Sequence, residues 1–240
     1  MAHRYTTLLL DADETIFDFI RAEHDSLKTV LSARGLPHSE EILLRYHEIN
    51  ASLWRAFERR EITKDRLRVQ RFEELFAMFG FAKETDPDAI STTYLAQLGE
   101  SDYLLPGADA FLYALKNGGY DLALITNGVA RTQLRRLQKS GLAPLFSHVF
   151  VSESVGAQKP LPAFFDAVFA AIDEKDKRKV LVIGDSLGSD IQGAANAGLD
   201  CVWYNPKGLA NDRGLPVALE AADFAQILAF LDVTVEKAGS

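Results

Sequence analysis

The 240-residue sequence has a single cysteine and lacks any apolar run long enough to cross a membrane. Because Cys201 has no second cysteine with which to form an internal disulfide, we expect a reducing cytoplasm and an inert thiol in the core. The first apolar run is soon interrupted by acidic residues, unlike a signal peptide. A membrane span needs about 20 apolar residues. These absences favour a soluble, cytoplasmic protein.

Positive charge is also scarce, with 26 lysines and arginines against 34 aspartates and glutamates, a net charge of -8 and a pI near 5.2. A nucleic-acid polymer normally requires a broad basic face, so we expect no such partner and no membrane partner. A small anionic ligand needs only a few local cations or a metal. A protein with a net charge of -8 can therefore still bind one. The five histidines show no metal-binding spacing.

Short apolar runs of strand length recur along the chain, each followed by small, polar or charged residues. These runs are Thr6–Leu10, Leu122–Ile125, Val149–Val151, Val180–Ile183 and Cys201–Tyr204. Amphipathic segments of helical length lie between the later runs, at Ala108–Lys116, Arg131–Lys139, Ala163–Ile172 and Asp190–Ala197. This alternation predicts an α/β fold, a Rossmann-like doubly wound parallel sheet covered by helices on both faces.

Residues 19–97 have a different pattern, in which apolar residues recur at helical spacing and no segment is typical of a strand. Thr63 is a candidate helix N-cap, and Pro87 suits an early position in a helix. We therefore expect an α/β core domain formed by residues 1–18 and 98–240. An all-helical cap domain, residues 19–97, would be inserted after the first strand, near the strand ends where such sheets bind ligands.

The polar residues that follow the apolar runs are the candidates for function. Asp11 and Asp13 follow the first run, Thr126–Gly128 follows the second, and Lys159 and Asp185 come after the third and fourth. Because the carboxyl ends of parallel strands share one edge of a sheet, these side chains can converge. If Asp11 and Asp13 only formed an ordinary turn, the presence of Thr126, Lys159 and Asp185 after the other strands would stay unexplained.

Carboxylates this close repel one another, and one of them takes up a proton unless a cation intervenes. Mg²⁺ prefers oxygen ligands and commonly also contacts a phosphate. Thr126, Lys159 and the amide of Asn127 suit phosphate oxygens, where charge develops during transfer. One aspartate would attack phosphorus and a neighbour would move protons. The residues therefore favour metal-assisted phosphoryl transfer with Mg²⁺ as cofactor.

The motifs D-A-D-E-T, I-T-N-G, K-P and G-D-S-L-G-S-D resemble the signature of the haloacid dehalogenase-like (HAD) superfamily of phosphohydrolases, in the same order along the chain. The resemblance implies that Asp11 is a nucleophile that becomes an aspartyl-phosphate. It implies that Asp13 is the general acid and base and that Thr15 supports the loop. The dehalogenases of the superfamily lack an aspartate at the position of Asp13, so its presence points to phosphate esters.

The same resemblance assigns the phosphate-binding and metal-binding residues. Thr126 and the amide of Asn127 would hold the phosphoryl group, with Gly128 in support, and Lys159 would offset negative charge.

The implied Mg²⁺ ligands are Asp11, Asp13, through its backbone carbonyl, and Asp185. Asp190 would act directly on the metal, through a water, or by bonding the lysine.

A narrower resemblance is to the pyrimidine 5′-nucleotidases, also called house-cleaning nucleotidases. It is carried by D-A-D-E-T-I-F, by Trp54 and Gln70-Arg71-Phe72 in the expected cap, by T-N-G-V and by S-E-S-V-G-A-Q-K-P. It implies a nucleoside 5′-monophosphate as substrate, such as UMP, dUMP, dTMP or a damaged relative. The alternatives are a phosphatase of another small phosphoester, such as a sugar phosphate or phosphoglycolate, and a phosphomutase using the same phosphoenzyme. A non-catalytic regulator on this scaffold is a third possibility. The oligomeric state stays open.

Cap residues that set specificity are not fixed by these patterns. Several aromatic residues are candidates to stack on a base, namely Phe17, Phe19, Trp54 and Phe57. We expect Trp54, Phe57, Phe72, Phe76 and Phe79 rather to form the core of the cap. Arg55 and Arg71 are candidates to reach a base edge. We expect solvated positions on a helix surface for these charges, with the alternative that one of the two turns inward.

Overall fold

The computed structural model describes residues 4–81 and 86–233, which divide into two compact units. The first, here called the α/β unit, contains residues 4–18, 104–130 and 140–233. The second, the helical unit, contains residues 19–81, 86–103 and 131–139. No helix within the described ranges is long and apolar enough to cross a membrane. That the helical unit is a cap on a catalytic core stays a prediction.

The α/β unit is built on one sheet of six parallel strands in the order β3-β2-β1-β4-β5-β6. The strands are β1 (Thr7–Leu10), β2 (Asp121–Thr126), β3 (His148–Val151), β4 (Val180–Gly184), β5 (Asp200–Tyr204) and β6 (Leu219–Ala221). The predicted α/β fold is confirmed, and each of the five apolar runs forms a strand. β6 was not predicted, because three residues are too few to show an alternating pattern.

The strand order places the end of β1 at a change of direction in the chain path. From β1 the chain proceeds to β2 and β3 on one side, and it then returns to β4, β5 and β6 on the other. Leu10, the last residue of β1, is paired with Leu124 on one side and Ile183 on the other. Ligands of doubly wound sheets bind outside the strand ends at such a switch point.

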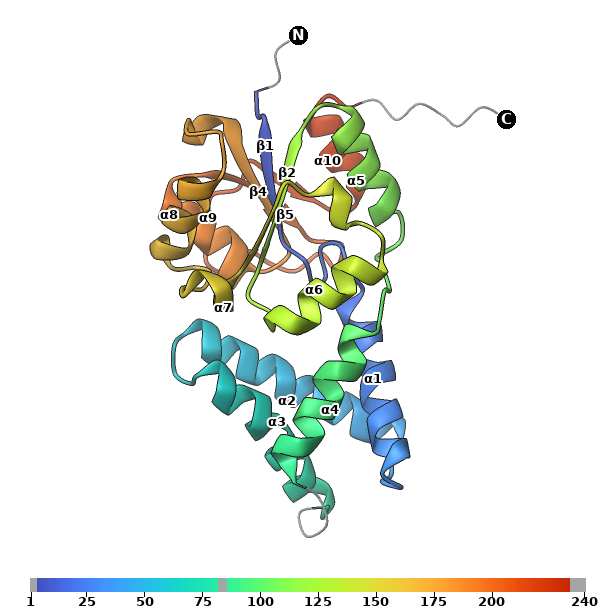
Figure 1. Cartoon of the computed structure of the whole chain (residues 1–240). Coiled ribbons are helices and arrows are strands. Elements are labelled where there is room, and N and C mark those ends of the chain that lie inside the picture. The colour runs from blue at the N-terminus through green and yellow to red at the C-terminus, as the bar shows by residue number, and fades with distance from the viewer. Residues whose placement is uncertain (1–3, 82–85, 234–240) are drawn as a thin grey trace, which may run out of the picture. The chain divides into compact units, whose positions relative to one another are not determined.

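Helices cover both faces of this sheet (Figure 1). They are α5 (Ala108–Asn117), α7 (Ser152–Val155), α8 (Pro162–Ala171), α9 (Gln192–Ala197) and α10 (Phe224–Phe230). On one face, Phe164 and Phe165 of α8 share a buried core with Leu9 and Val182 of the sheet. On the other, α5 contacts α10, with ring centroids of Phe111 and Phe224 4.5 Å apart. Burying side chains of this size stabilises the fold by about 1.5–3 kcal/mol each.

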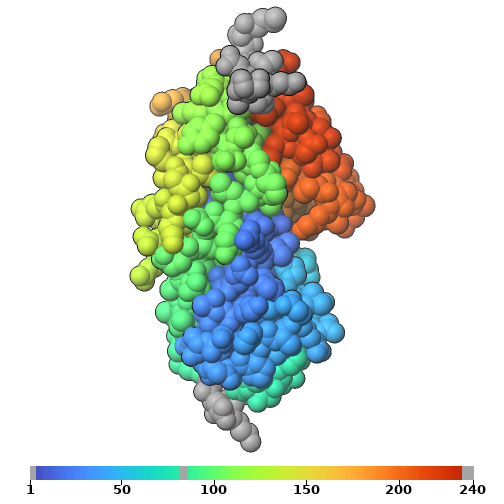
Figure 2. Space-filling model, turned by 90° about the vertical axis from the view of Figure 1, so that its right-hand side faces the viewer, coloured from blue at the N-terminus to red at the C-terminus, as the bar shows by residue number. Residues whose placement is uncertain are grey.

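The helical unit consists of α1 (Phe19–Ala33), α2 (Glu40–Glu58), α3 (Lys64–Phe79), α4 (Pro87–Gly99) and most of α6 (Ala130–Lys139). Thr63 caps α3 by accepting a hydrogen bond from the backbone N–H of Arg66 at 3.2 Å, as predicted. Pro87 is the first residue of α4, where its missing N–H costs no helical bond. The exposed surfaces of α1 and α2 form the blue area of Figure 2.

The expectation of an aromatic core in this unit is largely correct. Phe57, Phe72 and Phe76 are buried, whereas Trp54 and Phe79 are only partly buried.

Candidate active site

Three carboxylates and one lysine meet at the carboxyl ends of the central strands. Asp11 follows β1, Asp185 follows β4, and Asp190 lies five residues further on. One carboxylate oxygen from each of these aspartates lies within 4.8 Å of the others. Lys159, in the connection between α7 and α8, extends its ammonium group to two of them. The sequence prediction of a convergent site is thus matched by the positions of these four residues.

Lys159 is 1% exposed and all three of its ammonium protons are used. Its Nζ donates to Asp11 Oδ1 at 2.5 Å, to Asp190 Oδ1 at 2.6 Å and to the carbonyl oxygen of Ile125 at 2.9 Å. Burial opposes the charged form, but the two carboxylates outweigh it and raise the pKa of Lys159. The lysine is therefore a fixed positive charge at this edge of the sheet.

One lysine does not neutralise the three aspartates. Burial and the nearby Asp190 carboxylate raise the pKa of Asp11 to about 8, despite the opposing effect of Lys159. Burial and the charges of Asp11 and Asp190 raise the pKa of Asp185 well above its ordinary value. With all three aspartates ionised the cluster would carry a net charge of -2, which a divalent cation would balance. The all-oxygen donor set fits Mg²⁺.

Asp190 is held by protein donors at both of its oxygens. Oδ1 accepts from Lys159, and Oδ2 accepts from the backbone N–H of Ser186 at 3.1 Å. Of the three arrangements predicted for this residue, the structure shows the bond to the lysine. The predicted helix start at Asp190 is wrong, because Leu187–Ile191 forms one wider helical turn and α9 begins at Gln192.

Gly184, the last residue of β4, allows Asp190 to approach the strand. A Cβ atom built on Gly184 would lie 2.4 Å from Asp190 Cγ, much closer than real carbon atoms approach. Asp190 is fully buried, and its two hydrogen bonds leave it little freedom to move aside. The glycine is thus required for the carboxylate to occupy this position.

The loop after β1 forms a tight turn. The backbone N–H groups of Ile16 and Phe17 both donate to the carbonyl of Ala12 at 2.9 Å, and the N–H of Glu14 donates to the carbonyl of Phe17. Glu14 has a φ of 57°, in the left-handed region that a residue with a side chain rarely adopts. Strained backbone of this kind is concentrated at functional sites. The turn places Asp13 beside the site and partly exposed.

Thr15, the predicted support of this loop, is fully buried. Its hydroxyl lies 3.5 Å from Asp185 Oδ1, at the limit of a hydrogen bond. The contact joins the loop after β1 to the residue after β4.

The segment after β2 is joined to the backbone of Lys159 by two hydrogen bonds. Asn127 Nδ2 donates to the carbonyl of Lys159, and Asn127 Oδ1 accepts from the N–H of Lys159, both at 2.9 Å. Thr126 ends β2, and its hydroxyl accepts from the N–H of Gly128 at 3.0 Å. The predicted residues Thr126, Asn127, Gly128 and Lys159 therefore lie in one connected group.

Trp203 was not identified from the sequence, although it contacts the site. This residue of β5 is 1% exposed, and its indole N–H donates to the carbonyl oxygen of Asp185 at 2.8 Å. In sequence it is one apolar residue among others, and no spacing motif links it to Asp185. A second missed contact joins Lys207 Nζ to Glu14 Oε2 at 3.4 Å.

The residues suggested for base recognition fall into different environments. Phe17 is fully buried, so it offers no exposed ring for stacking, and Phe57 packs edge-on against Trp54 with ring centroids 5.6 Å apart. Arg55 is exposed, as expected for a surface charge. Arg71 is only 2% exposed, so it is the one of the two arginines that turns inward.

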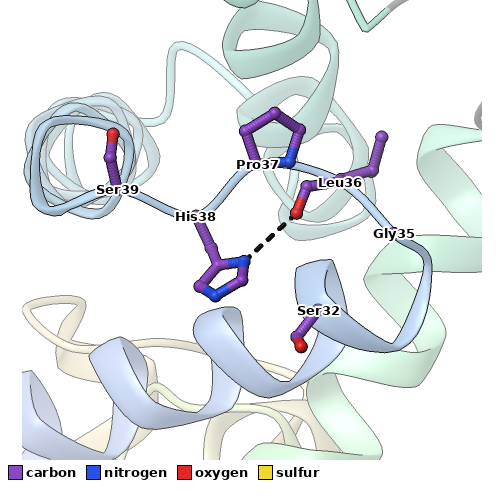
Figure 3. A pocket seen from close by; sticks show the side chains of 6 residues that line it. All are labelled: Ser32, Gly35, Leu36, Pro37, His38 and Ser39. Atoms are coloured by element: carbon purple, nitrogen blue, oxygen red, sulfur yellow. Dashed lines mark hydrogen bonds between the residues drawn. The ribbon is translucent and has the colours of Figure 1, made fainter.

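A hollow of about 500 Å³ lies in the helical unit, at the turn between α1 and α2 (Figure 3). It is lined by Ser32, Gly35, Leu36, Pro37, His38 and Ser39. His38 Nδ1 is bonded to the carbonyl of Leu36 at 3.2 Å. The lining contains no carboxylate, lysine or arginine, so it has none of the groups that distinguish the cluster at the strand ends.

Comparisons with known proteins point to one family. A family model described as haloacid dehalogenase-like hydrolase matches residues 5–198. HAD-hydrolase YfnB of Bacillus subtilis is 40% identical over 203 residues, which is 85% of each chain. Pyrimidine 5′-nucleotidase PynA of Streptococcus pneumoniae is 37% identical over 231 residues, covering 96% of this chain and 97% of its own. Pyrimidine 5′-nucleotidase YjjG of Escherichia coli is 30% identical, covering 86% and 92%.

A solved structure agrees with these matches. The magnesium-bound crystal structure of YfnB superposes with a TM-score of 0.91 at 37% identity, and the match covers 96% of this chain and 100% of that one.

Proposed function

Because this chain belongs to the haloacid dehalogenase-like hydrolase family, we propose that it is a Mg²⁺-dependent phosphatase acting on pyrimidine nucleoside 5′-monophosphates. The family match and the relatives confirm the resemblance and the HAD-type enzyme class expected from the sequence motifs. The observation that carries the proposal is the buried Lys159 between Asp11 and Asp190, with Asp185 beside them. The nucleotidase names of PynA and YjjG support the choice of substrate.

In the proposed reaction, Asp11 is the nucleophile. One of its oxygens attacks the phosphorus, the bond between phosphorus and the ester oxygen breaks, and an aspartyl-phosphate forms. Lys159 is fixed 2.5 Å from Asp11 Oδ1, where its charge offsets the charge of the carboxylate and of the phosphate oxygens. Thr126 and the amide of Asn127 would bind the remaining phosphate oxygens.

Proton transfer is assigned to Asp13, which the turn after β1 leaves partly exposed. As an acid it protonates the departing nucleoside oxygen, and as a base it then takes a proton from the water that attacks the aspartyl-phosphate. The products are a nucleoside and inorganic phosphate, and Asp11 is regenerated.

Bound Mg²⁺ would supply electrostatic stabilisation of the phosphate charge. The residues proposed to hold it are Asp11, Asp185 and the carbonyl of Asp13. Asp190, whose two oxygens are bonded within the protein, would orient Lys159.

The test is phosphate release from p-nitrophenyl phosphate and from a panel of metabolites with and without Mg²⁺. We expect turnover that requires Mg²⁺, that is abolished by Asp11→Asn, and that favours UMP, dUMP or dTMP over purine nucleotides and sugar phosphates. Absence of turnover on every phosphoester would refute the proposed enzyme. A preference for sugar phosphates would refute the choice of substrate and leave the phosphatase chemistry intact.

A further inference from the structure

The tip of the turn after β1 is formed by Asp13 and Glu14, the two residues of the turn that the protein interior does not enclose. Asp11 and Ala12 before the tip are buried, and Thr15–Phe17 after it are fully buried, whereas Asp13 and Glu14 are only partly buried. Glu14 has a φ of 57°. A glycine adopts this conformation readily, whereas a residue with a Cβ atom is strained in it. The presence of a glutamate at this position therefore indicates a role for its side chain.

The backbone conformation of Glu14 also orients a proposed Mg²⁺ ligand. The angle φ of Glu14 describes rotation about the bond that follows the peptide group joining it to Asp13. That peptide group contains the backbone carbonyl of Asp13, and its N–H donates to the carbonyl of Phe17 at 2.9 Å. Because a trans peptide group is planar, with its N–H and C=O opposed, the Asp13 carbonyl is directed away from that of Phe17. A change of backbone conformation at Glu14 would therefore turn the proposed ligand.

Lys207 contacts the Glu14 carboxylate from the loop after β5. Its Nζ lies 3.4 Å from Glu14 Oε2, and the side chains of Lys207 and Glu14 are 59% and 21% exposed. A pair of exposed charges usually contributes little to the stability of a fold. This pair joins a largely covered carboxylate on a strained residue to a second loop of the same unit. Its main effect therefore falls on the conformation of the turn after β1.

The loop that carries Lys207 is itself held in place by Asn205, which is 4% exposed. Asn205 Oδ1 accepts from the N–H of Leu209, and Asn205 Nδ2 donates to the carbonyl of Leu209, both at 2.9 Å. The same Nδ2 donates to Glu220 Oε1 at 2.7 Å, and the N–H of Asn205 donates to the carbonyl of Ala221 at 2.7 Å. These bonds close the loop around Lys207 and join it to β6, so the lysine extends from a fixed backbone.

The charge of Glu14 also acts on the candidate Mg²⁺ site. Burial, the carboxylates of Asp11 and Asp190 and, after them, the carboxylate of Glu14 raise the pKa of Asp185 well above its ordinary value. Glu14 is therefore close enough to Asp185 for the position of its carboxylate to matter, and Lys207 contacts that carboxylate.

We propose that Lys207 is a positioning residue of the active site. Its bond to Glu14 holds the strained tip of the turn, and thereby keeps the Asp13 carbonyl in the orientation that Mg²⁺ binding requires. The inference rests on the proposed Mg²⁺-dependent function, and it assigns Lys207 no contact with the substrate. A side chain from the loop after β5 thus supports a metal ligand in the loop after β1.

The test measures Mg²⁺ affinity by calorimetry without substrate, and the Mg²⁺ concentration that gives half-maximal turnover of p-nitrophenyl phosphate. In Lys207→Met we expect Mg²⁺ to bind about 3- to 10-fold more weakly by both measures, less than the roughly 10- to 100-fold typical of direct supports of metal ligands. The KM for p-nitrophenyl phosphate at saturating Mg²⁺ should change less than about twofold. Electrostatics alone predicts the opposite sign, because removing a nearby positive charge favours binding of a cation.

Three further variants sharpen the test. Lys207→Arg keeps the positive charge and should retain Mg²⁺ affinity within about twofold. In a Glu14→Gln background, Lys207→Met should cause no further loss of affinity, because the lysine acts through the carboxylate. Lys179→Met is the matched control, because Lys179 pairs with Glu174 at 3.8 Å and directly precedes β4, at the end of that strand opposite to the site.

Unchanged or tighter binding of Mg²⁺ in Lys207→Met would overturn the inference. So would an equal loss in Lys207→Arg, or an equal further loss in the Glu14→Gln background. Absence of turnover by the unmodified protein would instead refute the proposed phosphatase. The two failures are distinguishable, because calorimetry measures Mg²⁺ affinity without any substrate.

Discussion

Lys159→Met should destabilise the α/β unit strongly. The substitution keeps the length of the side chain and removes the ammonium group that bonds Asp11, Asp190 and the carbonyl of Ile125. Two carboxylates would then be buried without their cation. Removing one partner of a buried ion pair costs about 3–5 kcal/mol. For a chain of this size that corresponds to a decrease of about 6–20 °C in Tm.

The measurement is urea and thermal unfolding in EDTA, so that no metal replaces the lost charge. Lys179→Met is the matched control in the same unit. The side chain of Lys179 is half exposed, and its Nζ lies 3.8 Å from Glu174 Oε2, which is a weak ion pair. Exposed pairs contribute about 0–1 kcal/mol. Added Mg²⁺ should restore part of the stability of Lys159→Met, since the cation supplies the missing charge.

Two further results would complete the test. In Lys159→Met/Asp190→Asn, where a buried charge is removed together with the lysine, the loss should be smaller than in Lys159→Met. Lowering the pH should also recover stability of the single variant, because protonation neutralises the buried carboxylates. If Lys159→Met costs no more than Lys179→Met, the buried charges do not interact as their positions indicate.

Three other outcomes are expected. In EDTA the free energy of unfolding should fall as pH rises from about 4 towards 8. Burial raises the pKa of Asp11 to about 8. The folded state therefore binds more protons than the unfolded state over that range, and raising the pH favours unfolding. Asp11→Asn should flatten this dependence, and an unchanged slope would contradict it. Trp203→Phe removes the N–H bond to the Asp185 carbonyl and should weaken Mg²⁺ binding about 10-fold in calorimetry, as for other supports of metal ligands. Trp54→Phe, in the helical unit, should leave that affinity unchanged. Gly184→Ala should displace Asp190 and lower both Tm and kcat, whereas wild-type values would show that the carboxylate has room to move.

In the helical unit, sequence patterns predicted the helices but not which charged side chains are buried between them. Amphipathic spacing, Thr63 and Pro87 predicted its helices, because capping and periodicity are local properties of the chain. The same spacing does not reveal that Arg71 is buried, since an arginine between apolar positions is usually on a solvated surface. Its burial depends on Glu23 and Asn50, which belong to two other helices.

The sequence by itself determined the α/β fold, the strand ends that carry Asp11, Thr126 and Asp185, and the family. These features follow from residue types at short spacing along the chain. Because parallel strands have their carboxyl ends at one edge of the sheet, identifying the strands is sufficient to place the residues that follow them at that edge. Only the tertiary structure decided that Asp190 bonds Lys159, that Gly184 makes room for it, and that Trp203 holds Asp185. Those contacts join strands and loops distant in the chain, where packing and the pairing of buried charges select partners that no local pattern records.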